Sequence, residues 1–172
     1  RALPMKYEID YVRAYQKEKN IVSGKVWRDT DGNVINAHGG GVLYHEGKYY
    51  WFGEHRPESG FVTQKGINCY SSIDLCKWKP EGIVLAVSGE EGADIEKGCI
   101  MERPKVIYNK QTGKFVMWFH LELKGRGYGP ARAAVAVSDS PTGPYCFIRS
   151  ARVNSSIYPL NMTKKEKRIK WN

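Results

Sequence analysis

Apolar and polar residues alternate along most of the chain, a pattern that predicts short β-strands joined by turns. Glycine, proline and asparagine separate the alternating runs, as expected at hairpin turns. Strands and hairpins are predicted at residues 41–54 (turning at Glu46-Gly47), 67–72, 77–87 (interrupted at 80–82), 104–122 (turning at 109–113) and 131–140. The sequence therefore predicts an all-β fold.

The two predicted hairpins resemble each other. Val42-Leu43-Tyr44 matches Val106-Ile107-Tyr108, and Gly47-Lys48-Tyr49 matches Gly113-Lys114-Phe115. The strands that follow them also correspond. A repeat of this length, built of short strands, is typical of one blade of a β-propeller. We predict two blades and the start of a third. Because each blade buries its faces only against its neighbours, the rest of the propeller is expected to be needed for stability.

The first residues have a different organisation. Residues 7–12 alternate as one strand, and the polar residues 17–20 that follow are typical of a linker. This strand has no partner nearby in the sequence. We therefore expect residues 1–16 to end a preceding β jelly-roll-like domain, residues 17–20 to be a linker, and residues 21–172 to be the first part of a propeller.

The composition is that of a globular protein, with 41% apolar and 26% charged residues in a chain of 172. No apolar run approaches the roughly 18 residues of a membrane span, so no membrane contact is predicted. The net charge is +9, and residues 163–170 hold five basic residues and one acid. This segment is the only one with a helical pattern, beginning at Thr163 with Glu166 three positions later. A solvated helix face is favoured over a nucleic-acid site, and binding of an anionic polymer stays a weaker alternative.

Four cysteines are scattered along the chain, at positions 69, 76, 99 and 146. No C-x-x-C pair is present, so no zinc site is predicted. Buried free thiols are the favoured interpretation. A bridge between Cys69 and Cys76 across a hairpin stays open.

The innermost strand of a propeller blade lines the central channel, and its first residues face the ligand. By the repeat, His38-Gly39-Gly40 and Glu102-Arg103-Pro104 are equivalent and are predicted to face one pocket. The glycines either let a substrate or a bulky neighbour approach the backbone, or they form a tight bend. Glu102 beside Arg103 is either a ligand contact or a structural ion pair.

Aromatic residues cluster around the two hairpins, and sugar rings stack on aromatic planes while carboxylates hold their hydroxyls. Most of these aromatics are expected to be core residues. Tyr128 differs, because it lies in the glycine-rich loop 124–132, where a core role is less favoured. Glu54, His55 and His120 fall at strand ends, where each alone is more typical of a structural hydrogen-bonding residue.

Four segments, in order and spacing, carry a resemblance to a known family: residues 35–55, 66–85, 101–122 and 131–145. Together they resemble glycoside hydrolase family 43, within the branch that contains exo-β-1,3-galactanases, over residues 21–172. The resemblance implies a five-bladed propeller and an inverting hydrolysis of O-glycosyl bonds. It implies an oligo- or polysaccharide substrate of the β-linked galactan or arabinogalactan type. It implies no cofactor, and no metal is predicted.

The resemblance also implies roles for individual residues. The usual family base is an Asp at the position of Gly39, and the galactanase branch lacks it and is thought to use a Gln from a later blade. Glu102 matches the carboxylate that orients and tunes the general acid. The acid, a Glu of the third blade, would lie beyond Asn172. Glu54 and Tyr128 match positions that contact sugar hydroxyls, with His38 and Gly39 beside them.

The leading hypothesis is therefore a fragment of an inverting glycosidase, inactive alone because acid and base lie elsewhere. The parent protein is expected to be secreted or periplasmic. A non-catalytic carbohydrate-binding β domain is the alternative, because the aromatics and Gly39 fit it equally well. Residues 1–16 weakly resemble the last strand of the laminarinase-like jelly rolls of glycoside hydrolase family 16, which would make the parent a fusion of two enzymes.

Overall fold

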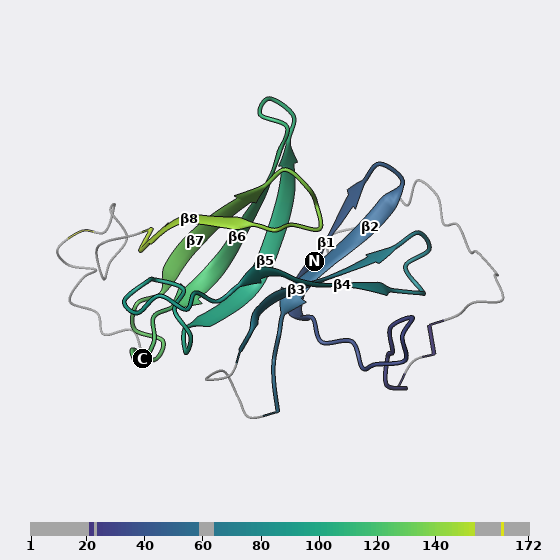
Figure 1. Cartoon of the computed structure of the whole chain (residues 1–172), viewed down its shortest axis with the longest axis horizontal. Coiled ribbons are helices and arrows are strands. Elements are labelled where there is room, and N and C mark those ends of the chain that lie inside the picture. The colour runs from purple at the N-terminus through teal and green to yellow at the C-terminus, as the bar shows by residue number, and fades with distance from the viewer. Residues whose placement is uncertain (1–20, 23, 59–63, 154–162, 164–172) are drawn as a thin grey trace, which may run out of the picture.

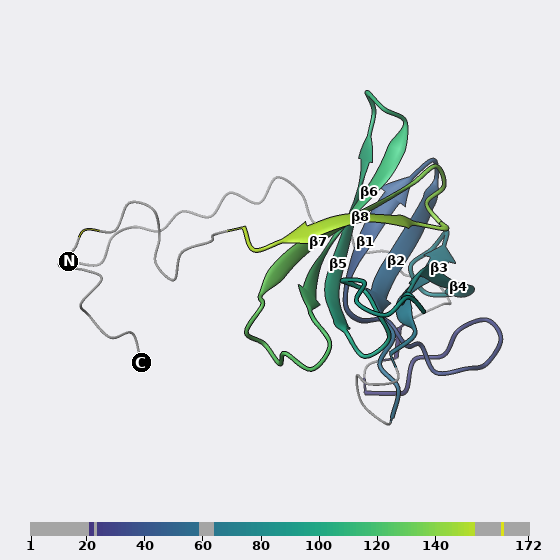
Figure 2. The same ribbon diagram turned by 60° about the vertical axis from the view of Figure 1, so that its left-hand side comes forward.

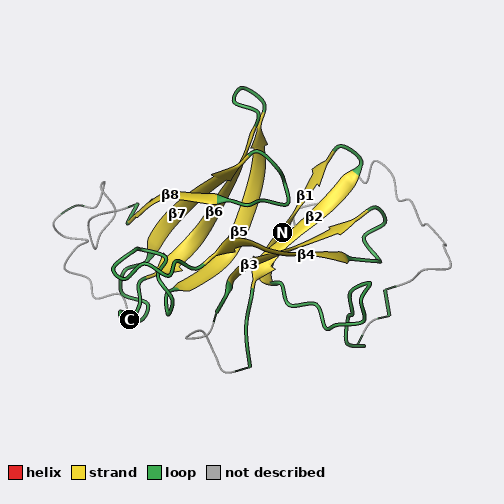
Figure 3. Cartoon of the chain, viewed as in Figure 1, coloured by secondary structure: helices red, strands yellow, loops and turns green. Residues whose placement is uncertain are grey.

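A computed structural model describes residues 21–22, 24–58, 64–153 and 163. The predictions for residues 1–20 and for the basic segment after Thr163 lie outside these residues. Across the described ranges the structure is all-β and contains no helix, so none is long and apolar enough to cross a membrane (Figure 3).

Eight strands form two four-stranded antiparallel sheets, each in simple meander order (Figure 1). This is the strand order of a propeller blade. The first sheet contains β1 (His38–His45), β2 (Lys48–Glu54), β3 (Gly66–Ser72) and β4 (Lys79–Ala86). The second sheet contains β5 (Ile100–Asn109), β6 (Lys114–Glu122), β7 (Arg132–Ser138) and β8 (Cys146–Ala151).

Both predicted hairpins are confirmed, with Glu46 and Gly47 at the first turn in the positive-φ conformation. Two details differ from the prediction. β4 runs through the predicted interruption as a bulged strand, since Gly82 adopts φ 87° and the edge position tolerates Pro80. β8 was not predicted, because Cys146–Ala151 lacks a clear alternation, and it completes the second sheet.

The predicted repeat extends to a backbone irregularity. β1 pairs with β2, and the register shifts between His38 and Gly41. β5 pairs with β6, and the register shifts between Glu102 and Lys105. Gly39 and Arg103 are the equivalent bulge residues, with φ 56° and 53°. Both inner strands therefore bend at the same point, and a non-glycine side chain accepts the left-handed conformation in the second sheet.

The core lies between the two sheets. β1 and β5 lie side by side in both views, and each sheet turns one face toward the other (Figures 1 and 2). Phe52 and Ile67 of the first sheet pack there with Met117 and Leu121 of the second, all fully buried. Burial of such side chains stabilises the pair by about 1.5–3 kcal/mol each.

A second, aromatic cluster covers the far face of the first sheet. Trp78 is buried there, with Trp27 and Trp51 packed around it at ring distances of 6.5 and 5.3 Å. The aromatic density of the first hairpin is therefore mostly packing, as predicted. None of the four cysteines forms a disulfide: Cys69 and Cys99 are buried, Cys76 is half-buried and Cys146 is exposed. Cys69 and Cys76 do not form the bridge that the sequence left open.

Candidate functional site

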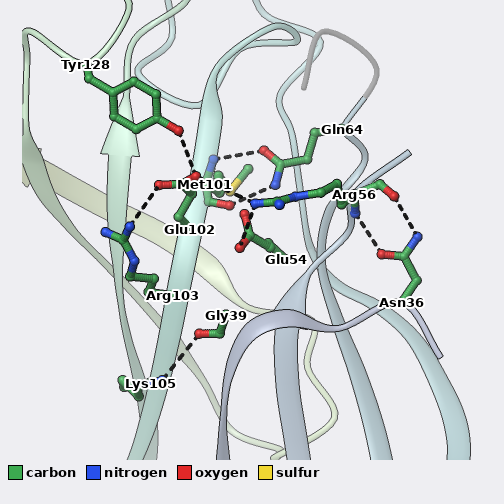
Figure 4. A network of polar contacts seen from close by, with 10 residues as sticks. All are labelled: Asn36, Gly39, Glu54, Arg56, Gln64, Met101, Glu102, Arg103, Lys105 and Tyr128. Atoms are coloured by element: carbon green, nitrogen blue, oxygen red, sulfur yellow. Dashed lines mark hydrogen bonds and ion pairs between the residues drawn. The ribbon is translucent and has the colours of Figure 1, made fainter. Parts of the chain in front are cut away.

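Two buried carboxylates, one from each sheet, form the centre of the candidate site (Figure 4). Glu54 ends β2 and is 3% exposed, and Glu102 lies near the start of β5 and is 4% exposed. Glu54 follows Phe52 by two positions, so the strand period turns it toward the second sheet. Glu102 directly precedes the bulge at Arg103. Residues of both inner hairpins therefore lie together here, with the Cβ position of Gly39 3.5 Å from Cγ of Arg103. The single pocket predicted for His38-Gly39-Gly40 and Glu102-Arg103-Pro104 stays a prediction.

Cationic and phenolic groups surround the pair. Arg56 places Nη2 3.4 Å from Oε1 of Glu54 and 4.0 Å from Oε1 of Glu102. The Tyr128 hydroxyl donates a hydrogen bond of 2.8 Å to Oε1 of Glu102. Arg103 approaches Oε2 of Glu102 only to 4.0 Å and is largely exposed. Both guanidinium groups therefore lie 4.0 Å from Glu102, and the Tyr128 hydroxyl is the closer partner of this carboxylate.

Each carboxylate keeps one oxygen without a hydrogen bond. Within the described part of the chain, the Oε2 atoms of Glu54 and Glu102 are both buried and have no hydrogen-bond partner. Leaving a buried carboxylate oxygen unpaired is costly, so such atoms are uncommon outside functional sites. Both are acceptors, which suits a ligand that supplies hydroxyl or ammonium donors.

Burial raises the pKa of Glu54, and the nearby Arg56 guanidinium opposes this shift. The charge of Glu102 adds a smaller upward contribution to the pKa of Glu54. The hydrogen bond to Glu102 raises the pKa of the Tyr128 hydroxyl, so that it stays a donor at neutral pH. The charge of Glu54 thus depends on Arg56.

The three successive glycines are explained by close neighbours within the protein. A Cβ at Gly39 would lie 2.8 Å from Oε1 of Glu54, and one at Gly40 would lie 2.2 Å from the Phe52 carbonyl oxygen. A Cβ at Gly41 would lie 2.8 Å from Cδ of Lys105, whose Nζ donates to the Gly40 carbonyl at 2.5 Å. The sequence left open whether the glycines form a tight bend or allow a close approach to the backbone. Both occur, because the backbone bends at Gly39 and bulky neighbours approach all three glycines. At Gly39 that neighbour is the Glu54 carboxylate.

Two amide side chains that the sequence did not single out support the carboxylates. Asn36 accepts from the Arg56 backbone N–H at 2.7 Å and donates to the Arg56 carbonyl at 3.0 Å. Gln64, which is 2% exposed, makes the same reciprocal pair with Met101, with both bonds 2.8 Å. Each amide fixes the backbone beside a charged site residue. No local pattern marks them, because their partners are distant in the sequence.

The histidines lie at the margin of the pair. His38 is exposed and pairs in register with Glu54. His55 accepts a hydrogen bond from the Lys65 backbone at 3.3 Å, and burial lowers its pKa, as expected of a structural residue. His120 stacks on Tyr128 with ring centroids 6.2 Å apart, and its Nε2 lies 2.8 Å from Oε1 of the fully buried Glu122, without hydrogen-bond alignment. Among the described residues no three His, Cys, Asp or Glu side chains gather as a metal site.

Comparison with solved structures gives strong matches. A GH43 β-1,3-galactosidase solved with galactodeoxynojirimycin is 83% identical over 88% of this chain and 44% of its own, with a TM-score of 0.78. An exo-β-1,3-galactanase from Clostridium thermocellum is 48% identical over 77% of this chain and 27% of its own, with a TM-score of 0.68. A Phanerochaete chrysosporium exo-β-1,3-galactanase solved with β-1,3-galactotriose is 39% identical over 76% and 29%, with a TM-score of 0.68.

The chain thus spans less than half the length of each of these proteins. No protein-family model matches it, and no curated protein does. The likeness confirms the expected fold, in which the two sheets are blades of a partial propeller. The roles of the individual site residues stay predictions.

Proposed function

Because the chain belongs to glycoside hydrolase family 43, in its exo-β-1,3-galactanase-like branch, we propose that it supplies part of the sugar site of an inverting hydrolase of β-linked galactans. Similar proteins were solved with a galactose-like iminosugar and with a β-1,3-galactotriose. The parent protein would act on galactan or arabinogalactan chains outside the cytoplasm, in a secreted or periplasmic form.

The observation that carries the proposal is the pair of buried carboxylates whose Oε2 atoms have no hydrogen bond from the described residues. A terminal galactose presents hydroxyl donors, and two charged acceptors from different blades can hold two of them in fixed directions. Tyr128 is 59% exposed and lies over Glu102, where it can close one side of the sugar. Glu54, Glu102 and Tyr128 are the proposed sugar-binding residues, and the role of Glu102 toward the acid is additional to this contact.

Inverting hydrolysis needs a general acid and a general base roughly 6.5–9.5 Å apart. Gly39 holds the position of the usual base, and the space next to it contains the Glu54 carboxylate. We assign Glu102 the role of orienting the acid, and we assign acid and base to residues outside this chain. The chain alone is then expected to bind the sugar and not to hydrolyse the polymer.

Titration calorimetry with galactodeoxynojirimycin tests the binding half of the proposal. The chain is expected to bind it, and Glu102→Gln to weaken binding by at least roughly tenfold, since hydrogen bonds to charged groups contribute about 1.5–3 kcal/mol. Glu58→Gln, at an exposed position, is the matched control and should bind as the native chain does. No binding by the native, folded chain would contradict the proposal.

Release of galactose from β-1,3-galactan tests the other half. The expected result is no turnover above the uncatalysed rate by the 172-residue chain. Measurable turnover would show that acid and base both lie within it. Turnover lost in Glu54→Gln, with binding of galactodeoxynojirimycin kept, would identify Glu54 as the base.

A further inference from the structure

Arg56 occupies the space between the two carboxylates of the site. Its Nη2 is 3.4 Å from Glu54 and 4.0 Å from Glu102, while its side chain stays 44% exposed. Two carboxylates in one buried site repel each other, and a guanidinium between them offsets both the repulsion and part of the desolvation cost. Arginine suits this position because its charge persists at any pH relevant to the protein.

A long, half-exposed side chain does not hold such a position unless its backbone is fixed. The Arg56 backbone is fixed by the two hydrogen bonds to the Asn36 side chain. Asn36 is itself held from the sheet: its N–H donates to the Tyr70 hydroxyl at 3.1 Å, and its carbonyl accepts from Asn68 Nδ2 at 2.6 Å. The loop after β2 is thereby tied to β3 through one residue, Asn36. Figure 4 shows the two bonds between its side chain and the Arg56 backbone.

We infer that Arg56, fixed by Asn36, is a positioning residue that keeps Glu54 charged and oriented for the sugar. The orientation of Glu54 for a sugar rests on the proposed function. The effect of Arg56 on the charge of Glu54 does not require a bound sugar. Neither residue needs to touch the ligand, since both act through the carboxylate. No corresponding arrangement is needed for Glu102, whose Oε1 accepts from Tyr128.

The groups that face Glu54 all bear on its titration. They are Arg56 in the loop after β2, His38 on β1, and Glu102 on β5. Arg56 favours the charged form most, His38 favours it less, and Glu102 opposes it. Gly39, whose Cβ position lies nearest to Glu54, adds no charge. Removing Arg56 therefore moves the titration of Glu54 to higher pH, while a merely structural loss at residue 56 would leave the midpoint where it is.

The test is a side-chain carboxyl titration followed by carbon-13 NMR on the whole chain without ligand. Arg56→Gln is expected to shift the Glu54 midpoint to higher pH than in the native chain. Arg56→Lys is expected to give a Glu54 midpoint between those of Arg56→Gln and the native chain. It keeps the positive charge but lacks the planar guanidinium. Asn36→Ala is expected to shift the midpoint in the same direction by a smaller amount, because the guanidinium is no longer fixed.

Arg126→Gln and Asn33→Ala are the matched controls. Both residues are exposed, and the two substitutions remove the same chemical groups as Arg56→Gln and Asn36→Ala. Both should leave the Glu54 midpoint unchanged. If Arg56→Gln does not fold, the Glu54 midpoints of Arg56→Lys and Asn36→Ala test the inference instead. Both variants keep a positive side chain at residue 56. An unchanged Glu54 midpoint in folded Arg56→Gln, or in folded Asn36→Ala, would overturn the inference. Since no sugar is present, this failure is separate from a failure to bind galactose analogues.

Discussion

The two sheets share one backbone plan but place their charges in opposite order. In the first sheet an imidazole, His38, stands on the inner strand opposite a carboxylate, Glu54, on the second. In the second sheet the carboxylate, Glu102, stands on the inner strand opposite the imidazole, His120. Both inner strands bulge at the next residue, with nearly equal φ angles. The repeat therefore determines where each inner strand bulges. The charges of each site half depend on whether the first or the second strand of the sheet carries the carboxylate.

The same inversion continues two positions later. Glu54 is followed by Arg56, whose cation contacts it at 3.4 Å, and His120 is followed by Glu122 at 2.8 Å. In the first sheet the cation serves the site carboxylate. In the second, the fully buried Glu122 also accepts from the Ala131 backbone at the end of the loop that carries Tyr128. The two positions therefore differ in role: the Arg56 cation adjusts the charge of Glu54, and the buried Glu122 carboxylate holds the loop.

The largest expected effect comes from filling the first bulge. Gly40→Ala places a Cβ against the Phe52 carbonyl oxygen, whereas the equivalent position of the second sheet already holds a proline, Pro104. We expect a loss of about 1–3 kcal/mol or more in unfolding free energy, measured by urea denaturation. Gly89→Ala, where a Cβ meets nothing within 4 Å, is the control and should stay within about 1 kcal/mol. Equal stability of the two variants would break the comparison.

A second expected effect separates the two equivalent inner-strand residues. Glu102→Gln should weaken galactodeoxynojirimycin binding by roughly tenfold or more, because it removes a charged acceptor from a buried site. His38→Gln, at the exposed equivalent position, should weaken it by about fivefold at most, since exposed groups contribute less than about 1 kcal/mol. Calorimetric affinities measure both. A larger loss at His38 would reverse the assignment of the carboxylate as the main contact.

The sequence identified the repeat, the two hairpins and the residues that converge, because these depend on local alternation and on glycine at turns. Glu102 was singled out from the repeat, whereas Glu54 and Tyr128 were assigned to the sugar only through the family resemblance, and all three roles stay predictions. Asn36 and Gln64 were not found, since their partners Arg56 and Met101 lie 20 and 37 residues away. The last strand, β8, was missed because the residues of this edge strand that turn inward, Phe147 and Ser150, give no apolar alternation.

A pH-dependent effect is expected at Glu54 and would sharpen the contrast in charge. Burial raises the pKa of Glu54 above its ordinary value of 4.5, so the folded state takes up this proton at higher pH than the unfolded state. The stabilising contribution of protonation is therefore complete below pH 4.5 and is lost as the pH rises through the folded pKa. Glu54→Gln should raise the urea midpoint at neutral pH, by less than Gly40→Ala lowers it.

Denaturation at a series of pH values checks this expectation. The gain of Glu54→Gln over the native chain should shrink as the pH falls through the raised pKa of Glu54, because the native carboxyl then becomes neutral as well. Glu46→Gln, at an exposed turn, should show no such trend. A gain that grows on acidification would contradict the direction of the shift.

The smallest expected effect concerns the loop of the second sheet. Tyr128→Phe removes the hydrogen bond to Glu102 but keeps the ring that stacks on His120. We expect sugar affinity to fall by about three- to fivefold, as for one neutral donor, and the unfolding free energy to change by less than about 0.5 kcal/mol. Unchanged affinity would mean that Tyr128 does not close the sugar site.

The central claim is that Glu54 and Glu102, from different sheets, serve one sugar. A double-mutant cycle of Glu54→Gln and Glu102→Gln with galactodeoxynojirimycin tests it most directly. One shared site predicts that each variant alone weakens binding and that their losses are non-additive by more than about 0.5 kcal/mol. Glu102→Gln combined with Glu58→Gln should be additive. Additive losses from Glu54 and Glu102, or a loss from only one of them, would contradict the shared site.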